Sequence, residues 1–482
     1  MLNYKFILKI LGFLVTLEGI IMIIPLLVSL ITGGTDSFAF LISSGITIIS
    51  GLALSLPFIK TPKNIGKREG YLLLILTFIF YSFFGGLPFT FSEFKLSVTD
   101  SFFEAMSGFT TTGASVIPDV EFISQGLLFW RSFTQWIGGM GIIILSLAVL
   151  PFFGITGMSL ISSESSDVNI DRINPKIKDS VLIVLSIYLI LTSAETILLT
   201  IGGMNFFDSL CHSFSTISTG GFSTHNDSLG NWNTPFIQYV VIFFMMLSGM
   251  NFSLIYFGFS GSIKKIFKNE EIKIYLTFIL AITVIVAIGW IVIYNNGIEE
   301  TIRKSLFQIT SLLSSTGFYT TEYKFWSEVI FLIFFTFLFV GGTTGSASGG
   351  VKVMRFVLVI KGCYNELVRL LHPNAIIPIR CNSKAVALPT LSNILIFCFI
   401  YILVFLLGSL TLMIAGVDFL SAMGSTASCL GNVGPGIGVI APFDTYIHLS
   451  VFSKWILSLI MLTGRLEVFV VISLFFSAFW KR

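Results

Sequence analysis

Four short stretches of the sequence place glycine beside small polar side chains, in a chain that is otherwise very apolar. They read TTTG at 110–113, ISTG at 217–220, SSTG at 314–317 and GNVG at 431–434. Glycine permits turning backbone conformations that a Cβ forbids. Carbonyl oxygens held in such turns can replace the hydration shell of a monovalent cation. The turns contain no acidic residue, so they suit a weakly held monovalent cation better than calcium or magnesium, which prefer carboxylates.

Each polar stretch ends a half-length apolar segment that is too short to cross a membrane. Three of these segments start with an acid, at Asp100, Asp208 and Asp418, and the third in chain order follows Glu299 and Glu300. Acid at a helix start favours capping and the helix dipole. The glycines that end the four stretches, Gly113, Gly220, Gly317 and Gly434, are 107, 97 and 117 residues apart. Spacing of this kind indicates one unit used four times.

The elements that carry these stretches must be membrane helices. Mean hydropathy is +0.93, charged residues are 11% of 482, and stretches of about 20 apolar residues recur along the chain. Soluble and disordered classes are excluded, and the first stretch lacks a clear cleavage site, so we interpret it as a retained helix. Five scattered cysteines have no metal-ligand or redox spacing. Ten spans are predicted, at 6–31, 38–59, 71–88, 127–151, 180–202, 235–257, 273–294, 325–366, 388–416 and 452–480.

The predicted fold is an all-α polytopic membrane protein. Two N-terminal helices (1–69) precede four pore repeats of span, short helix, polar hairpin and span, at 70–153, 154–260, 261–380 and 381–482. Of the 28 basic residues, 21 fall on the side of the two termini and six on the other, with Arg465 set aside. The excess of positive charge marks the cytoplasmic side, so both termini are predicted to be cytoplasmic.

The span at 325–366 is interrupted by GGTTGSASGG, and the last span contains a charged residue. The run comprises Gly341, Gly342, Thr343, Thr344, Gly345, Ser346, Ala347, Ser348, Gly349 and Gly350. It fits a linker between half-helices, a close-packing face of small residues, or a phosphate-binding nest, although the GK[ST] of a P-loop is absent. Arg465 lies near the middle of its span, where charge is expensive and marks function by default. Glu467, two residues on, does not face it on a helix.

The chain resembles the potassium-translocating subunits of the bacterial Trk/Ktr group, a superfamily with fungal and plant relatives. The resemblance covers the whole chain and rests on the four repeats with one glycine each, SGFTTTGAS, RLLHPNA (369–375), NVGPG and the glycine-rich run. The two helices before the first repeat are similar to the TrkH branch rather than the shorter KtrB branch. The resemblance implies a dimeric potassium uptake pore in the bacterial cytoplasmic (inner) membrane, regulated by a cytoplasmic nucleotide-binding ring of TrkA type.

The resemblance also implies roles for individual residues. Carbonyls just before each filter glycine line the ion path in the family. Here the filter residues are Thr111, Thr112 and Gly113, Ser218, Thr219 and Gly220, Ser315, Thr316 and Gly317, and Asn432, Val433 and Gly434. The fourth hairpin has a second candidate in Gly431, because its acid-to-glycine spacing is 16 rather than 13 or 12. The resemblance implies that residues 341–350 form a gate loop, which projects into the pore beneath the filter. It places Arg465 beside this loop, where the cation would repel potassium and hydrogen-bond to loop carbonyls.

Other charged residues are given structural interpretations. Lys352 and Arg355 are predicted to be anchors at the cytoplasmic end of their span. Glu104 and His212 are predicted to pack behind the filter, and Glu195 to lie near the outer interface. Potassium is the transported ion, and no organic cofactor and no nucleic-acid partner are expected on this chain.

Two other functions are weighed against a gated potassium pore. A secondary transporter coupling cation uptake to sodium or protons also uses broken helices at the membrane midplane. Against it, the repeats run in parallel and carboxylates suited to proton relay are scarce within the spans. A membrane enzyme would need a catalytic constellation, and the sequence has no H-E-x-x-H, nucleophile elbow or Ser/Lys pairing. No enzymatic activity is therefore expected.

Overall fold

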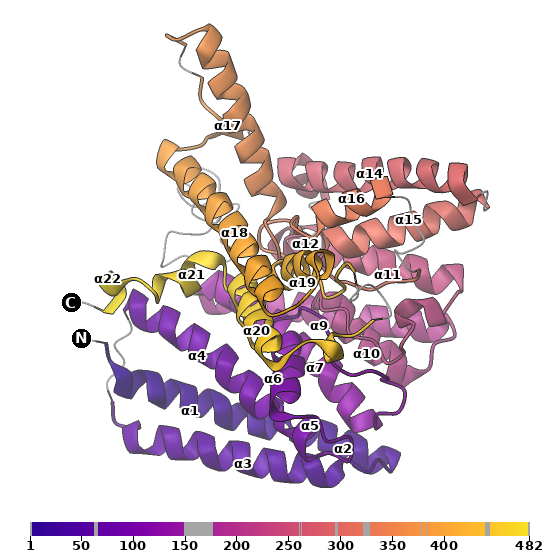
Figure 1. Ribbon diagram of the computed structural model, residues 1–482, viewed down its shortest axis with the longest axis vertical. Helices are drawn as coiled ribbons and strands as arrows, with labels where there is room; N and C mark the ends of the chain where they lie inside the picture. Colours follow the sequence, from indigo (N-terminus) through magenta and orange to yellow (C-terminus); the bar gives the residue numbers. More distant parts are fainter. Residues whose placement is uncertain are drawn as a thin grey trace.

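The computed structural model is almost entirely helical (Figure 1). It describes residues 2–61, 66–148, 177–259, 261, 263–294, 297–321, 328–375, 377–382, 384–438 and 444–480. Within these residues the strands are β1 (Arg380–Cys381) and β2 (Lys384–Ala385), which pair antiparallel with Arg380 opposite Ala385. The all-α class predicted from the sequence is confirmed.

The N-terminal helices form a layer at one edge of the molecule, beside α4 (Figure 1). They are α1 (Tyr4–Ile21), α2 (Ile23–Thr32) and α3 (Ser37–Ser55), followed by the 3-10 turn η1 (Leu56–Phe58). Helices α1 and α3 approach closely because glycines face each other: a Cβ on Gly12 would lie 2.6 Å from the carbonyl oxygen of Gly51. Ser44 Oγ donates to the carbonyl of Gly19 at 2.7 Å. Small residues allow such contact between helices in a bilayer.

The remaining chain forms four units, each with a long helix, a short helix ending in a polar hairpin, and a second helical part. The first has α4 (Lys67–Gly85), α5 (Leu87–Phe91), α6 (Val98–Phe109) and α7 (Gln125–Ala148). The second has α9 (Ile177–Ile201), α10 (Phe206–Ile217), η3 (Ser228–Asn231), α11 (Pro235–Ser248) and α12 (Phe252–Phe259). The third has α13 (Ile263–Lys268), α14 (Glu270–Tyr294), α15 (Ile298–Leu313), α16 (Glu328–Phe337) and α17 (Val353–Leu371). The fourth has α18 (Leu388–Ile414), α19 (Phe419–Gly431), η5 (Tyr446–His448), α20 (Val451–Arg465), α21 (Val468–Ser473) and α22 (Ser477–Trp480).

Six described helices are long and apolar enough to cross a membrane, or seven if the bent pair α11 and α12 is one span. The six lie at Tyr4–Thr32, Ser37–Phe58, Arg68–Phe91, Val181–Ile201, Glu270–Ile291 and Leu388–Ile414. They match six of the ten predicted spans. The unit boundaries drawn from the sequence stay predictions, and the one at 153–154 lies outside the described residues.

Two spans predicted to be continuous are broken. The segment 235–257 is α11 and α12, bent by 111° at Gly249 to Asn251. The segment 452–480 ends its first helix at Arg465, and Glu467 follows with φ +57°, a value that no α-helix contains. Both breaks are stabilised from outside the helix: Asn251 Nδ2 donates to the carbonyl of Thr344 at 2.8 Å, and Glu467 accepts from Arg355 Nη2 at 2.7 Å.

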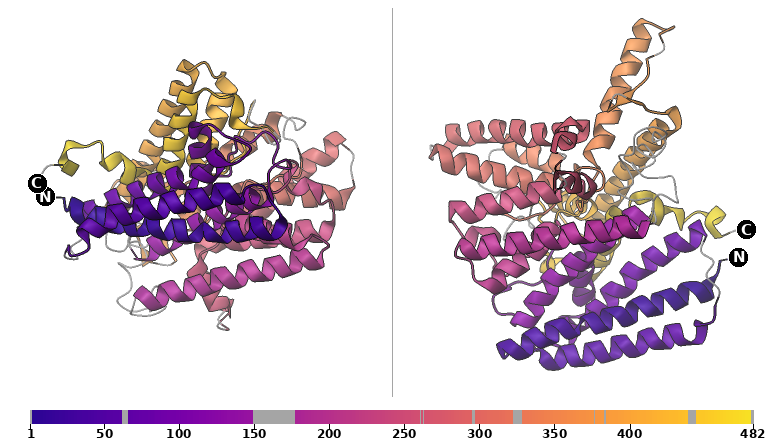
Figure 2. Two further views of the ribbon diagram at one scale, coloured as in Figure 1. Left: turned by 90° about the horizontal axis from the view of Figure 1, so that it is seen from below. Right: turned by 180° about the vertical axis from the view of Figure 1, so that it is seen from behind.

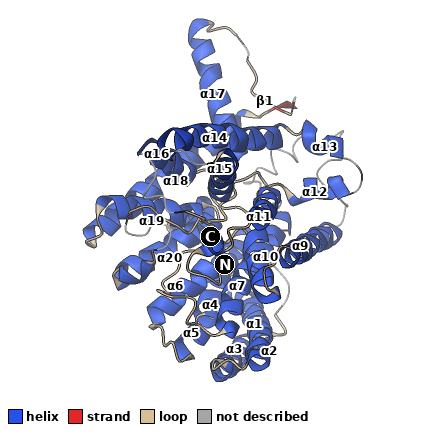
Figure 3. Ribbon diagram, turned by 90° about the vertical axis from the view of Figure 1, so that its right-hand side faces the viewer, coloured by secondary structure: helices blue, strands red, loops and turns tan. Residues whose placement is uncertain are grey.

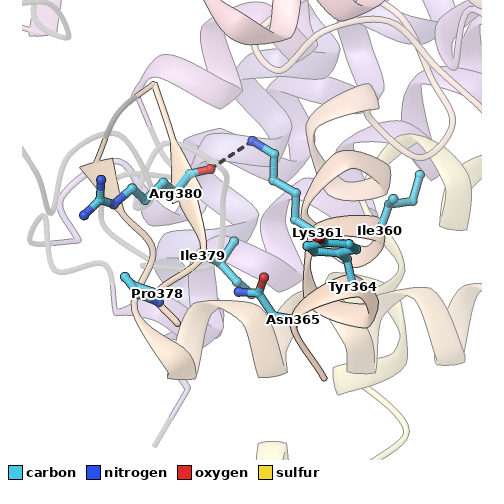
Figure 4. Close-up of a pocket in the computed structure, with 7 residues that line it drawn as sticks. All are labelled: Ile360, Lys361, Tyr364, Asn365, Pro378, Ile379 and Arg380. Carbon is cyan, nitrogen blue, oxygen red and sulfur yellow. Dashed lines mark hydrogen bonds between the residues drawn. The ribbon is translucent and has the colours of Figure 1, made fainter. Parts of the chain in front are cut away.

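Helix α17 and the short sheet form an arm that projects away from the helical body (Figures 1 and 3). The arm holds a pocket of about 470 Å³. Its lining, shown in Figure 4, comprises Ile360, Lys361, Tyr364, Asn365, Pro378, Ile379 and Arg380. Lys361 Nζ reaches across it to the carbonyl of Arg380 at 2.9 Å. None of these residues belongs to the predicted filter or gate, so the pocket is separate from that site.

The first and last described segments lie close together in all views of Figures 1 and 2. Arg68 Nη1 on α4 donates to the carbonyl of Phe479 on α22 at 3.3 Å. Ile7 and Leu72 pack with Phe479 in a small apolar cluster at this place. The chain therefore closes on itself, and the fourth unit returns to the first.

Candidate ion pathway

Three of the four short helices, α6, α10 and α19, start at comparable side-chain caps. Ser97 and Asn205 accept a hydrogen bond from the backbone amide three residues on, at Asp100 and Asp208, and Asp418 does the same for Ser421. Asp418 is thus the cap itself, whereas Asp100 and Asp208 lie in the first turn. Helix α15 is capped by Gly297 and carries Glu299 and Glu300 in its first turn. This difference in register explains why the acid-to-glycine spacing is longer in the fourth hairpin.

The hairpins after these helices share one backbone conformation. The first residue of each turn is a non-glycine residue with φ between +50° and +57°, namely Thr111, Thr219, Ser315 and Asn432. The residue two places on is a glycine with φ between +78° and +98°, namely Gly113, Gly221, Gly317 and Gly434. The residue between them donates its amide to a carbonyl five positions earlier, in the bonds from Thr112 to Ser107, Gly220 to Ser215, Thr316 to Ser311 and Val433 to Ser428. The match at all three positions fixes the register of all four hairpins.

This register corrects the predicted second hairpin by one residue. The glycine equivalent to Gly113 is Gly221, and Gly220 takes the place of Thr112. Ser218 and Gly431 each directly precede the first residue of their turn. They lie where the short helices α10 and α19 end, so neither belongs to the turn itself. In the fourth hairpin the glycine with the conformation of Gly113 is Gly434 rather than Gly431. The number of residues from the helix cap to the turn glycine is then the same in the first, second and fourth units, which run from Ser97 to Gly113, from Asn205 to Gly221 and from Asp418 to Gly434.

The four turn glycines form a closed ring. A Cβ on Gly113 would lie less than 3.0 Å from the carbonyl oxygen of Gly220. The same overlap would occur between Gly221 and Thr316, between Gly317 and Val433, and between Gly434 and Thr112. Each hairpin thus touches the next in chain order, and the last touches the first. We call Gly113, Gly221, Gly317 and Gly434 the ring glycines. Only glycine fits these four positions, because of both the contact and the positive φ.

The 341–350 loop lies directly against this ring. The amide of Gly349 donates to Ser315 Oγ at 2.6 Å, and a Cβ on Gly349 would overlap the carbonyl of Gly431. The loop closes on itself where Gly341 N donates to the carbonyl of Val351 at 2.9 Å. At its other side Thr343 N donates to the carbonyl of Gly249, at the break in the second unit, at 2.8 Å. The ten residues are therefore ordered by contacts with three units.

Arg465 contacts the loop as the resemblance implied. Its Nη1 donates to the carbonyl of Ala347 at 2.8 Å, and the residue is 4% exposed. Within the described residues its Nε and Nη2 have no hydrogen-bond partner. Glu467 is paired with Arg355 instead, at 2.7 Å. The guanidinium is thus held by one loop carbonyl and keeps two nitrogens free toward its surroundings.

Lys352 and Arg355, which the sequence predicts to be anchors at the cytoplasmic end of their span, both make contacts inside the protein. Lys352 Nζ donates to Ser348 Oγ at 3.0 Å and also to the Ser348 carbonyl. Arg355 lies 4.0 Å above the ring of Phe397 and pairs with Glu467. Two cations therefore hold consecutive carbonyls of the loop, Arg465 at Ala347 and Lys352 at Ser348. Helix α17 begins only at Val353, so Lys352 is its N-cap and lies against the loop at Ser348.

Several residues that contact the site were missed in the sequence. Glu271, at the start of α14, accepts from both the amide and the hydroxyl of Thr344, at 2.7 and 3.0 Å. Asn251 donates to the carbonyl of Thr344, and Gln135 on α7 donates to the carbonyl of Gly220 at 2.7 Å. Gly249, which precedes Asn251 by two residues, is a signal for the end of a helix and could have indicated the break at this place. Glu271 and Gln135 give no local signal, since their partners are more than 70 residues away.

The structural interpretations of Glu104 and His212 agree with the structure. Glu104 accepts from Arg131 Nε at 2.8 Å and from the amide of Val116 at 2.9 Å, behind the first hairpin. His212 contacts the carbonyl of Asp208 at 2.8 Å and Ser223 Oγ at 3.0 Å, behind the second. Glu195 is fully buried on α9.

Comparison with known proteins places the chain in a family. A family model described as TrkH, cation transport protein, matches residues 36–481. The chain belongs to the TrkH family. A crystal structure of the potassium transporter TrkH from Vibrio parahaemolyticus superposes with a TM-score of 0.92 at 32% identity, covering 99% of this chain and 100% of that one.

Curated relatives agree with this membership of the TrkH family over the full length. The Trk system potassium uptake protein TrkH of Escherichia coli K12 is 36% identical over 486 residues, which is 100% of both chains. The Trk system potassium uptake protein TrkG of the same strain is 32% identical over 475 residues, which is 98% of this chain and 97% of that one. TrkH-family proteins are transporters, and the apolar helices described above make this member a multi-pass membrane protein.

Proposed function

We propose that this chain takes up potassium across the cytoplasmic membrane through a gated pore whose filter is the ring of four hairpins. The observation that carries the proposal is the closed ring, in which each ring glycine touches the carbonyl of the next hairpin. Irregular backbone at membrane depth is tolerated where it lines a water-filled cavity. Relatives over the full length are named potassium uptake proteins, which supports potassium as the ion.

In this proposal the hairpin backbones supply oxygen ligands to a partly dehydrated ion. The filter residues are Thr111, Thr112 and Gly113, Thr219, Gly220 and Gly221, Ser315, Thr316 and Gly317, and Asn432, Val433 and Gly434. Each hairpin is fixed by its bond back to its own short helix, so its carbonyls are positioned before an ion arrives. Such preorganised carbonyls replace water without a large reorganisation.

The 341–350 loop is proposed as the gate. It contacts the third hairpin at Ser315 and the end of α19 at Gly431, and two cations, Arg465 and Lys352, hold it. Two unit charges 4 Å apart at an effective dielectric of ~20 interact by about 4 kcal/mol. A buried cation beneath the ring therefore opposes the passage of potassium until loop and cation move together.

The proposed setting follows the resemblance and the charge distribution. Both termini face the cytoplasm of a bacterium, the protein lies in its inner membrane, and two copies form a homodimer. A cytoplasmic nucleotide-binding subunit of TrkA type regulates the gate. The projecting arm of α17 and the short sheet supports this setting, because it carries the basic residues Lys361, Arg369, Arg380 and Lys384 away from the helical body (Figure 3).

Potassium uptake by cells that lack their own uptake systems tests the proposed function. The parent chain should restore growth on low potassium and rubidium uptake. Gly317→Ala should abolish both, because the added Cβ would overlap the carbonyl of Val433. Gly45→Ala is the matched control, since nothing lies within 4 Å of its Cβ. Uptake by Gly317→Ala equal to that of Gly45→Ala, at equal amounts in the membrane, would show that the ring is not the ion path.

A further inference from the structure

One hairpin of the ring differs from the others in the residue that precedes its ring glycine. The first, third and fourth hairpins have branched side chains here, at Thr112, Thr316 and Val433, and the second has Gly220. Thr112 Oγ1 is bonded to Thr110 Oγ1 at 2.8 Å, and Thr316 Oγ1 to Ser314 Oγ at 2.7 Å. The second hairpin cannot make this bond, because Gly220 has no side chain.

The space left by Gly220 is filled by Gln135, from the second helix of the neighbouring unit. A Cβ on Gly220 would lie less than 3.0 Å from the Cδ, Oε1 and Nε2 atoms of Gln135. Gln135 is fully buried. Its amide therefore occupies the volume that a threonine or valine side chain takes in the other three hairpins.

Gln135 also bonds to the hairpin on both sides of its ring glycine. Nε2 donates to the carbonyl of Gly220 at 2.7 Å, and Oε1 accepts from the amide of Phe222 at 3.1 Å. These two bonds assign the orientation of the side-chain amide, since the reverse would place like groups together. The residues flanking Gly221 are thus joined through one side chain.

The carbonyl held by Gln135 belongs to the ring itself. The oxygen of Gly220 is the one that the Cβ of Gly113 would overlap, so it lies at the seam between the first and second hairpins. A carbonyl oxygen has two lone pairs and can accept from Gln135 while keeping one for an ion. One turn earlier on α7, Arg131 Nη1 donates to the carbonyl of Ser223 at 3.1 Å. Helix α7 therefore holds the second hairpin at two places.

We propose that Gln135 is a positioning residue for ion selectivity, which sets the place of the Gly220 carbonyl in the ring. This inference rests on the proposed function. In the first and third hairpins a hydroxyl of the filter residue itself braces the turn, whereas in the second the brace comes from another unit. Without Gln135, Gly220 and Gly221 become two adjacent unbraced glycines, and the hairpin can close around a smaller ion. Discrimination against sodium is then lost, while potassium still passes.

Competition between rubidium and sodium in proteoliposomes tests the proposal. Gln135→Met keeps the length and approximate volume of the side chain and removes both hydrogen bonds. We expect it to retain rubidium uptake and to lose most of the parent's preference over sodium. Gln238→Met is the matched control, because Gln238 is a buried glutamine on α11 that bonds to Trp232 and Arg303, outside the ring. Its ion preference should equal that of the parent.

A pair of variants keeps the proposal testable if Gln135→Met is poorly folded. Gly220→Thr alone should lower uptake, since its Cβ would overlap Gln135. Gln135→Ala with Gly220→Thr gives the second hairpin the pattern of the first, and should restore both uptake and ion preference toward the parent. An unchanged preference in Gln135→Met, or no recovery in the double variant, would overturn the proposal. A parent protein that takes up neither rubidium nor potassium would instead contradict the proposed function.

Discussion

At the scale of single residues, the buried Arg465 and the half-buried Lys352 are two cations that bond to adjacent carbonyls of one loop. The sequence identified Arg465, because a charge inside an apolar span is visible without a structure. It did not show that Lys352, which follows the glycine-rich run, bonds to the loop at Ser348. The difference lies in where α17 begins, which depends on the bond from Val353 N to the Gly342 carbonyl at 3.2 Å.

Replacing Arg465 by alanine should raise ion flux through the unstimulated protein several-fold. The variant removes the charge and the bond to the Ala347 carbonyl, so both the repulsion and the hold on the loop are lost. Rubidium uptake in proteoliposomes measures the effect. Arg465→Lys, which keeps the charge, should fall between the parent and the alanine variant. A folded alanine variant that carries no more ion than the parent would remove Arg465 from the gate.

At the scale of elements, the sequence shows the fourfold repeat and three of the four ring glycines. Turn glycines are local signals, because their positive φ favours glycine. The second hairpin was placed one residue early, since Gly220 and Gly221 are indistinguishable without a fixed helix start. The helix breaks at Gly249 and Leu466 were not predicted, because contacts between units stabilise them: Asn251 with Thr344 and Glu467 with Arg355.

Glu271 ties the 341–350 loop to the start of α14, so its loss should also raise resting flux. Its carboxylate accepts two hydrogen bonds from Thr344. Hydrogen bonds to charged groups contribute about 1.5–3 kcal/mol, so Glu271→Ala favours a displaced loop by a similar amount. Glu271→Gln keeps one acceptor for Thr344 and should have a smaller effect. Equal resting uptake in the parent and both variants would show that this anchor does not hold the loop closed.

The ion pair between Lys454 on α20 and Asp100 on α6 joins the fourth unit to the first, at 2.6 Å. Breaking a buried pair by removing one partner costs about 3–5 kcal/mol. Asp100 is 15% exposed, so we expect a loss of about 2 kcal/mol in Lys454→Met. Thermal unfolding of the detergent-solubilised protein should show a lower Tm, with Lys454→Arg close to the parent. A Tm of Lys454→Met equal to that of the parent would mean that packing alone holds α20 to α6.

At the scale of the whole molecule, the fold is a ring of four unequal copies. The hairpins share one backbone, yet their braces differ: the first and third use their own hydroxyls, the second uses Gln135, and Asn432 of the fourth donates to Thr112 at 2.9 Å. The second helices differ as well, since α7 is unbroken over its described length while the other three are interrupted. The sequence repeats predict the features that the four units share. The 341–350 loop and the residues that hold it occur where the units differ, so the repeats do not predict them.

Current through the purified protein in a planar bilayer tests the central claim most directly. With potassium on one side and sodium on the other, the parent should give a reversal potential set by potassium, without dependence on a sodium or proton gradient. Gly317→Ala should carry no such current, because its Cβ would overlap the Val433 carbonyl and open the ring. Current that follows a coupled ion gradient, or an unchanged reversal potential in Gly317→Ala, would contradict a potassium pore formed by the four hairpins.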